Sequence, residues 1–144
     1  MTIELPKTTW VPGESPRPDD AWLHAIDPDL LVSVGAVLFE KHFGFEAHEA
    51  WEQAWKAAKA HGCLDDERML RALIKLAAAM VKVRQHNPTG VRDHAHGAAA
   101  ALDEVGAKAV LGFDVAGVVA MARRVEAAAA ELDLRVFGKL IRAE

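Results

Sequence analysis

Five of the six prolines of this chain lie within its first 28 residues. Proline fixes φ and lacks an N–H group, so a helix cannot run through such a segment. The sequence therefore predicts an extended, Pro-rich N-terminal arm over residues 1–28 and a single helical-bundle domain over residues 29–144. Trp10 and Trp22 are costly to leave in water and are expected to anchor the arm across the helical body. A loose tail or a partner-binding segment is the alternative, because chain termini often fray.

The rest of the chain has the composition and the periodicity of helices. It contributes most of the 28 alanines, and tyrosine is absent altogether; alanine favours helices, whereas aromatic residues favour strands. No strand pattern or internal repeat is present. Apolar spacing, capping residues and breakers predict five helices, over residues 29–42, 45–60, 66–85, 89–105 and 114–132. A short additional helix could follow Asp133. The predicted fold is therefore all-α, a compact bundle of five or six short helices.

Charge and cysteine content exclude several classes of function. The net charge of −4 and the pI near 6.0 argue against a nucleic-acid-binding module. The longest apolar stretch, residues 72–83, is interrupted by Lys75 and Lys82, so no membrane span is expected. The N-terminus lacks a signal-peptide pattern and Cys63 is the single cysteine, so we expect a cytoplasmic protein. Its alanine-rich helices over residues 89–132 would allow the close approach of two copies in a homo-oligomer.

The segment 45–60 carries the residues that are most suited to chemistry. His48 and Glu52 are four residues apart, so on a helix both could reach one metal ion, and Glu49 beside them could act as a general base. The spacing is similar to the zinc-protease pattern His-Glu-x-x-His, with Glu52 in place of the second histidine. Farther along, His94 and His96 are only two residues apart, so they face different sides of a helix and form a poor chelating pair.

A purely structural interpretation of the same residues is also open. Glu46 and Glu49 fall in the first turns of the predicted helix, where its dipole favours acids by about 0.3–1 kcal/mol. Glu52 precedes Lys56 by four residues, the spacing of a helical ion pair. In this interpretation His48 is a half-buried ring that is hydrogen-bonded to Glu52.

Two blocks of sequence resemble a known family, the domain of unknown function 309. The first block is Phe43-Gly44-Phe45-Glu46-Ala47-His48-Glu49, followed by Glu52 and Trp55. The second block is Leu70-Arg71-Ala72-Leu73-Ile74-Lys75-Leu76-Ala77-Ala78-Ala79, followed by Asn87 and Gly90. The resemblance covers about residues 30–105. It implies a small all-helical fold without an established reaction, although members are often labelled predicted metal-dependent hydrolases.

The chain departs from the family pattern on the predicted helix 66–85. Lys75 stands where the family has glutamine, and Lys82 stands where it usually has histidine. A lysine ammonium near the acids of residues 45–60 would replace the charge of a metal ion. We therefore expect a metal-free polar cluster in which Glu49 and Glu52 pair with Lys75 or Lys82, the alternative for the lysines being an ordinary solvated face. The candidate cluster comprises Glu46, His48, Glu49, Glu52, Lys75, Lys82 and Asn87.

These features leave two hypotheses for the function. The first is a structural or interaction domain without a cofactor, whose polar cluster serves the fold. The alternative is a metal-dependent hydrolase in which His48 and Glu52 bind a divalent metal such as zinc and Glu49 is the base. The missing histidine at position 82 favours the first hypothesis.

Overall fold

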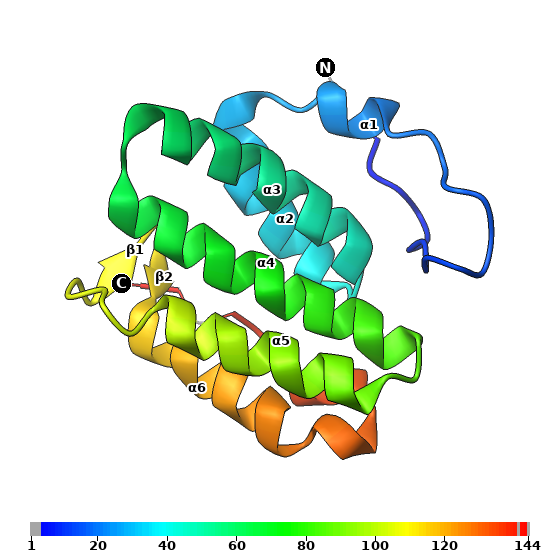
Figure 1. Ribbon diagram of the computed structural model, residues 1–144. Coiled ribbons are helices and arrows are strands. Elements are labelled where there is room, and N and C mark those ends of the chain that lie inside the picture. Colours follow the sequence, from blue (N-terminus) through cyan, green and yellow to red (C-terminus); the bar gives the residue numbers. More distant parts are fainter. Residues whose placement is uncertain (1–3, 141, 144) are drawn as a thin grey trace.

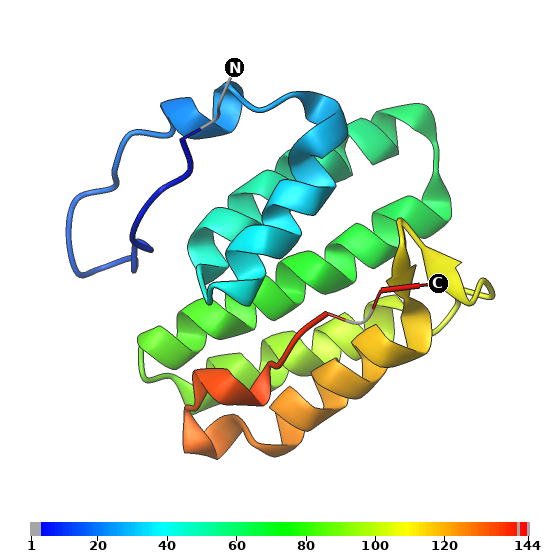
Figure 2. The same ribbon diagram turned by 180° about the vertical axis from the view of Figure 1, so that it is seen from behind.

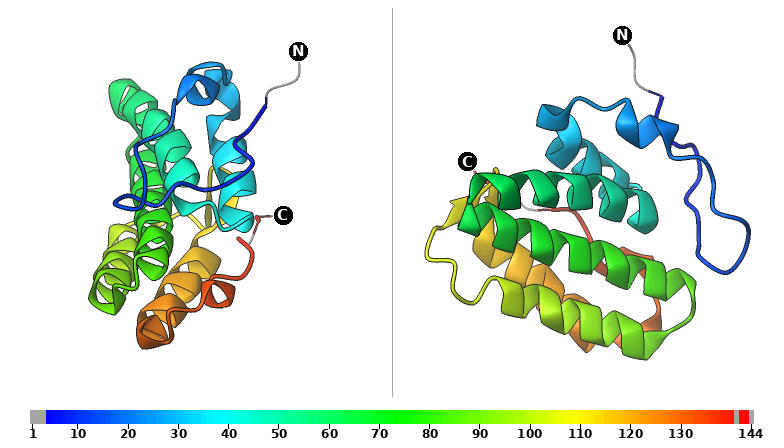
Figure 3. Two further views of the ribbon diagram at one scale, coloured as in Figure 1. Left: turned by 90° about the vertical axis from the view of Figure 1, so that its right-hand side faces the viewer. Right: turned by 45° about the horizontal axis from the view of Figure 1, so that its top comes forward.

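The helices form two layers. The computed structural model describes residues 4–140 and 142–143. One layer consists of three consecutive helices, α3 (Gly44–His61), α4 (Leu64–Arg84) and α5 (Pro88–Ala101), which pack side by side in antiparallel order (Figure 1). The second layer consists of α2 (Leu31–Glu40), which packs on α3, and α6 (Val115–Ala127), which packs on α5 (Figure 3). The other face of α4, between α3 and α5, therefore points away from the second layer.

Short elements complete the chain. They are the helix α1 (Ala21–His24), the strands β1 (Ala109–Val110) and β2 (Phe113–Asp114), and 3₁₀ turns at Pro28–Leu30, Ala129–Glu131 and Leu134–Val136. The strands pair as a hairpin around Leu111 and Gly112, both of which have positive φ. The C-terminal segment crosses the back of the molecule between α2 and α6 (Figure 2), and Phe137 and Leu140 are buried there.

The predicted all-α class is confirmed, with corrections at the ends of elements. The Pro-rich segment was expected to contain no helix, yet α1 forms at Ala21–His24, a stretch without proline. The hairpin was not expected because its strands are only two residues long. The helices predicted to reach residues 105 and 132 end at Ala101 and Ala127, the second being continued by a 3₁₀ turn.

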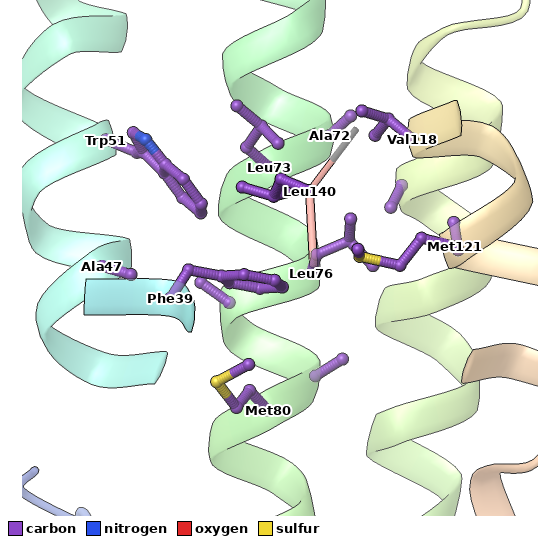
Figure 4. Close-up of a cluster of buried hydrophobic side chains, with 14 of the residues drawn as sticks. Phe39, Ala47, Trp51, Ala72, Leu73, Leu76, Met80, Val118, Met121 and Leu140 are labelled. Carbon is purple, nitrogen blue, oxygen red and sulfur yellow. The ribbon is translucent and has the colours of Figure 1, made fainter. Parts of the chain in front are cut away.

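The core lies between the two layers. Trp51 of α3 and Phe39 of α2 are fully buried, with ring centroids 5.5 Å apart, and Phe137 contacts Phe39 from the C-terminal segment at 5.8 Å. Leu76 on the inner face of α4 lies beside them (Figure 4). Because α4 buries this stripe, its polar residues are left on the opposite face. Among the described residues, no helix is long and apolar enough to cross a membrane.

Candidate functional site

Helix α3 positions the candidate residues by burying one side. It begins at Gly44 and ends at His61, and the positive φ of Gly62 closes it in a left-handed cap. Ala47, Ala50, Trp51 and Ala54 are buried in the core. His48, Glu49 and Glu52 are thereby turned to the outer surface, where each remains half-buried.

His48, Glu49 and Glu52 converge. His48 Nδ1 lies 3.5 Å from Glu49 Oε1 and 3.5 Å from Glu52 Oε2. Each residue offers one ligand atom, and these atoms lie within 4.8 Å of one another, a separation that one metal ion could bridge. The donors would suit a divalent cation such as zinc, which binds imidazole and carboxylate. The spacing in the sequence had predicted this proximity, and the structure adds that Glu49 can also be a ligand.

Glu49 also interacts with the N-terminal arm. Arg17 Nη2 lies 3.1 Å from Glu49 Oε2. The contact with His48 holds the pKa of the Glu49 carboxyl below its ordinary value; burial acts in the opposite direction, and Arg17 adds to the lowering. Glu49 is therefore held as a carboxylate whose two oxygens face two different partners, the His48 imidazole and the Arg17 guanidinium.

Glu46 is separated from this triad and binds the arm. Its side chain is only 3% exposed, and it accepts hydrogen bonds from Thr9 Oγ1 at 2.6 Å and from the Trp10 backbone N–H at 2.9 Å. The Trp10 ring packs edge-on against Phe45, with centroids 4.7 Å apart, and the Arg17 guanidinium lies over the Phe45 ring, 5.3 Å from its centroid. We call Phe45, Glu46 and Glu49 together with Thr9, Trp10 and Arg17 the arm clamp.

The remaining members of the predicted cluster lie on α4 and at the start of α5. Asn87 caps α5, since its side chain accepts from Gly90 N at 2.9 Å. Lys75 and Lys82 are half-buried on the outer face of α4. Within residues 4–140 and 142–143, no ion pair within 4.0 Å joins either lysine to Glu49 or Glu52. The expected direct pairing is therefore not formed, although Lys75 and Glu52 line the same pocket of about 360 Å³.

His94 on α5 is the residue that the sequence interpretation undervalued. Burial lowers the pKa of its imidazole, and the charges of Lys75, Lys82 and His48 lower it further, whereas Asp93 raises it. His94 therefore lies within the electrostatic reach of both lysines. Its spacing from Gly90 and Gly97, at i−4 and i+3, places all three on one face of α5. The sequence could have indicated the importance of His94 through this shared helix face.

Residues 32–93 match the family model described as a domain of unknown function, DUF309. This stretch of the chain is similar to DUF309. The resemblance carried by the two sequence blocks is thus confirmed. The DUF309 match spans α2, α3, α4 and the first turns of α5, so it includes the triad, both lysines and Asn87. No curated protein and no solved structure matches the chain.

Proposed function

We propose that this protein is a non-catalytic helical interaction domain in which the acidic residues of α3 hold the N-terminal arm. The observation that carries the proposal is the arm clamp. Glu46 is buried beneath Thr9 and Trp10, and Glu49, the one candidate base of the sequence pattern, is paired with Arg17. A carboxylate with a lowered pKa accepts a proton less readily, which makes Glu49 a poor general base.

A divalent-metal hydrolase is the second candidate, favoured by the convergence of the triad. His48 and Glu52 would hold the ion, and Glu49 would be either a third ligand or the base, but not both at once. The metal would supply a polarised water as nucleophile. Arg17 opposes this function, because it places a positive charge 3.1 Å from an oxygen that the cation or the proton would need.

Metal content decides between the two functions. We would measure metal by elemental analysis of protein that has been purified without an affinity tag or added metal, and then melt it with and without zinc, manganese and nickel. The matched control is His96→Ala, because His96 also faces a carboxylate, Glu126, at 3.0 Å but belongs to no triad. We expect no stoichiometric metal and the same melting response in wild type, His48→Ala and His96→Ala. A stoichiometric metal that only His48→Ala removes would establish the metal site that the hydrolase requires and would contradict a metal-free cluster.

The proposal extends to location and assembly. A single exposed cysteine, Cys63, fits the reducing cytoplasm, where disulfides are rare. The outer residues of α5 and α6 include exposed alanines such as Ala100 and Ala120, which would let helices of two copies approach closely. Sedimentation at two protein concentrations tests this assembly, which a concentration-independent monomer would contradict.

A further inference from the structure

The outer face of α4 carries two lysines whose stems lie against glycines of α5. Lys75 and Lys82 are two helical turns apart, and so are Gly97 and Gly90 on the antiparallel neighbour. A Cβ added at Gly97 would lie 3.1 Å from Lys75 Cδ, and one added at Gly90 would lie 2.8 Å from Lys82 Cδ and Cγ. The absence of these two side chains therefore lets both lysine stems lie along α5 rather than extend into solvent.

The two ammonium groups have no anionic partner in the described part of the chain. No lysine there takes part in an ion pair within 4.0 Å, but Lys75 and Lys82 are half-buried, whereas the other lysines are exposed to water. His94 lies between the two glycines on the facing helix and feels the charge of both lysines. The Lys75 ammonium, 3.3 Å from a Cβ added at Gly97, and the Lys82 stem beside Gly90 thus lie along the seam between α4 and α5, on either side of the helix position of His94.

We propose that Lys75, Lys82 and His94 form a binding site for a phosphate group, as a free ion or as a monoester. A phosphate monoester carries about −1.5 to −2 charges at neutral pH, which matches two ammonium groups. Lysine binds phosphate as a point charge, without the planar geometry that arginine requires. A neutral imidazole N–H is a further donor to a phosphate oxygen.

The acidic residues nearby restrict where an anion can bind. Glu52 lines the pocket beside Lys75, and an anion there would be repelled by its carboxylate. His48 lies 3.5 Å from Glu52 and Glu49, and Arg17 offsets Glu49 from the other side. We therefore expect phosphate to bind toward α5, away from Glu52, and the neutral variant Glu52→Gln to bind phosphate more tightly than wild type.

The test is a titration of the full chain with inorganic phosphate, at constant ionic strength held with potassium chloride. Amide chemical shifts of Gly90 and Gly97 report on the site by NMR. We expect saturable shifts with roughly millimolar affinity. Binding should weaken at least about tenfold in Lys75→Gln and in Lys82→Gln, because each loses a charge-assisted contact. The matched control is Lys56→Gln, an exposed lysine of α3, which should bind phosphate like wild type.

Gly97→Ala distinguishes a built site from general attraction to a basic surface. It leaves every charge in place, but its new methyl group presses on the Lys75 stem, so phosphate binding should weaken while the helical content is kept. Shifts that do not saturate, or that persist equally in Lys75→Gln and Lys82→Gln, would overturn the proposal. This site lies outside the arm clamp, so the metal analysis above can succeed or fail without deciding the phosphate titration.

Discussion

Replacing Glu46 tests the arm clamp most directly. The Glu46→Ala variant deletes two hydrogen bonds to an almost completely buried carboxylate, those from Thr9 and from the Trp10 N–H. A hydrogen bond to a charged group contributes about 1.5–3 kcal/mol, so an upper limit for the pair is ~3–6 kcal/mol. In the variant the arm can detach, and water can then accept hydrogen bonds from the freed Thr9 and Trp10 donors. The loss of stability is therefore no larger than the stability that the docked arm contributes. We therefore expect the free energy of unfolding to fall by about 2 kcal/mol.

Two assays separate local release of the arm from global destabilisation. Urea unfolding followed by circular dichroism gives the free energy of unfolding, and limited trypsin cleavage after Lys7, an exposed residue of the arm, reports how often the arm opens. Glu46→Gln keeps one acceptor oxygen and should fall between wild type and Glu46→Ala in both assays. Glu40→Ala, which removes an exposed acid from the end of α2, is the control. If Glu46→Ala matched wild type in stability and in cleavage rate, the clamp would have no energetic role.

Three further predictions concern the core, the cap of α5 and pH. Gly35→Ala would drive a methyl group into the buried indole of Trp51, whose N–H donates to Val32 O at 3.0 Å. We expect the free energy of unfolding in urea to fall by about 1–3 kcal/mol. A gain in stability, as alanine gives at an unhindered helix position, would contradict the clash. Asn87→Ala should cost about 1 kcal/mol by removing the N-cap, and Asn87→Asp should retain most of it. Since the folded-state pKa of His94 is lowered, the unfolded chain binds its proton more tightly, and wild-type stability should decline as the pH falls below about 6.5. His94→Gln should weaken that decline between pH 8 and pH 5, and an unchanged pH profile of urea unfolding would contradict the assignment.

Periodicity predicted the long helices because burial of one stripe governs them. The helix expected over residues 45–60 is observed as Gly44–His61, and that expected over residues 66–85 is observed as Leu64–Arg84. Elements that depend on few residues were missed. Helix α1 occupies a gap between prolines, and the hairpin depends on Leu111 adopting a positive φ, a conformation that its side chain disfavours.

The candidate site was predictable only where one helix supplies all its members. The spacing of His48 and Glu52 fixes their proximity, whatever the rest of the chain does. Glu46 was grouped with them, although its partners Thr9 and Trp10 come from a segment without any periodic pattern, more than 30 residues earlier. Contacts of this kind depend on the path by which the arm crosses α3, and local sequence patterns do not predict that path.

The lysines of α4 show that two packed helices can indicate a candidate site that the sequence of neither helix indicates alone. Considered singly, Lys75 and Lys82 indicate a solvated face, and glycine within a helix is only a cost of about 1 kcal/mol relative to alanine. Considered together, the two-turn spacing of the lysines matches that of Gly90 and Gly97 on the antiparallel neighbour, and each glycine leaves the room that a lysine stem occupies. Packing of the stems can offset the cost of the glycines, because lysine methylene groups bury apolar surface while the ammonium group stays accessible. The same packing restricts where the two charges can go, and a restricted pair of cations loses less conformational entropy on binding an anion than two free side chains would.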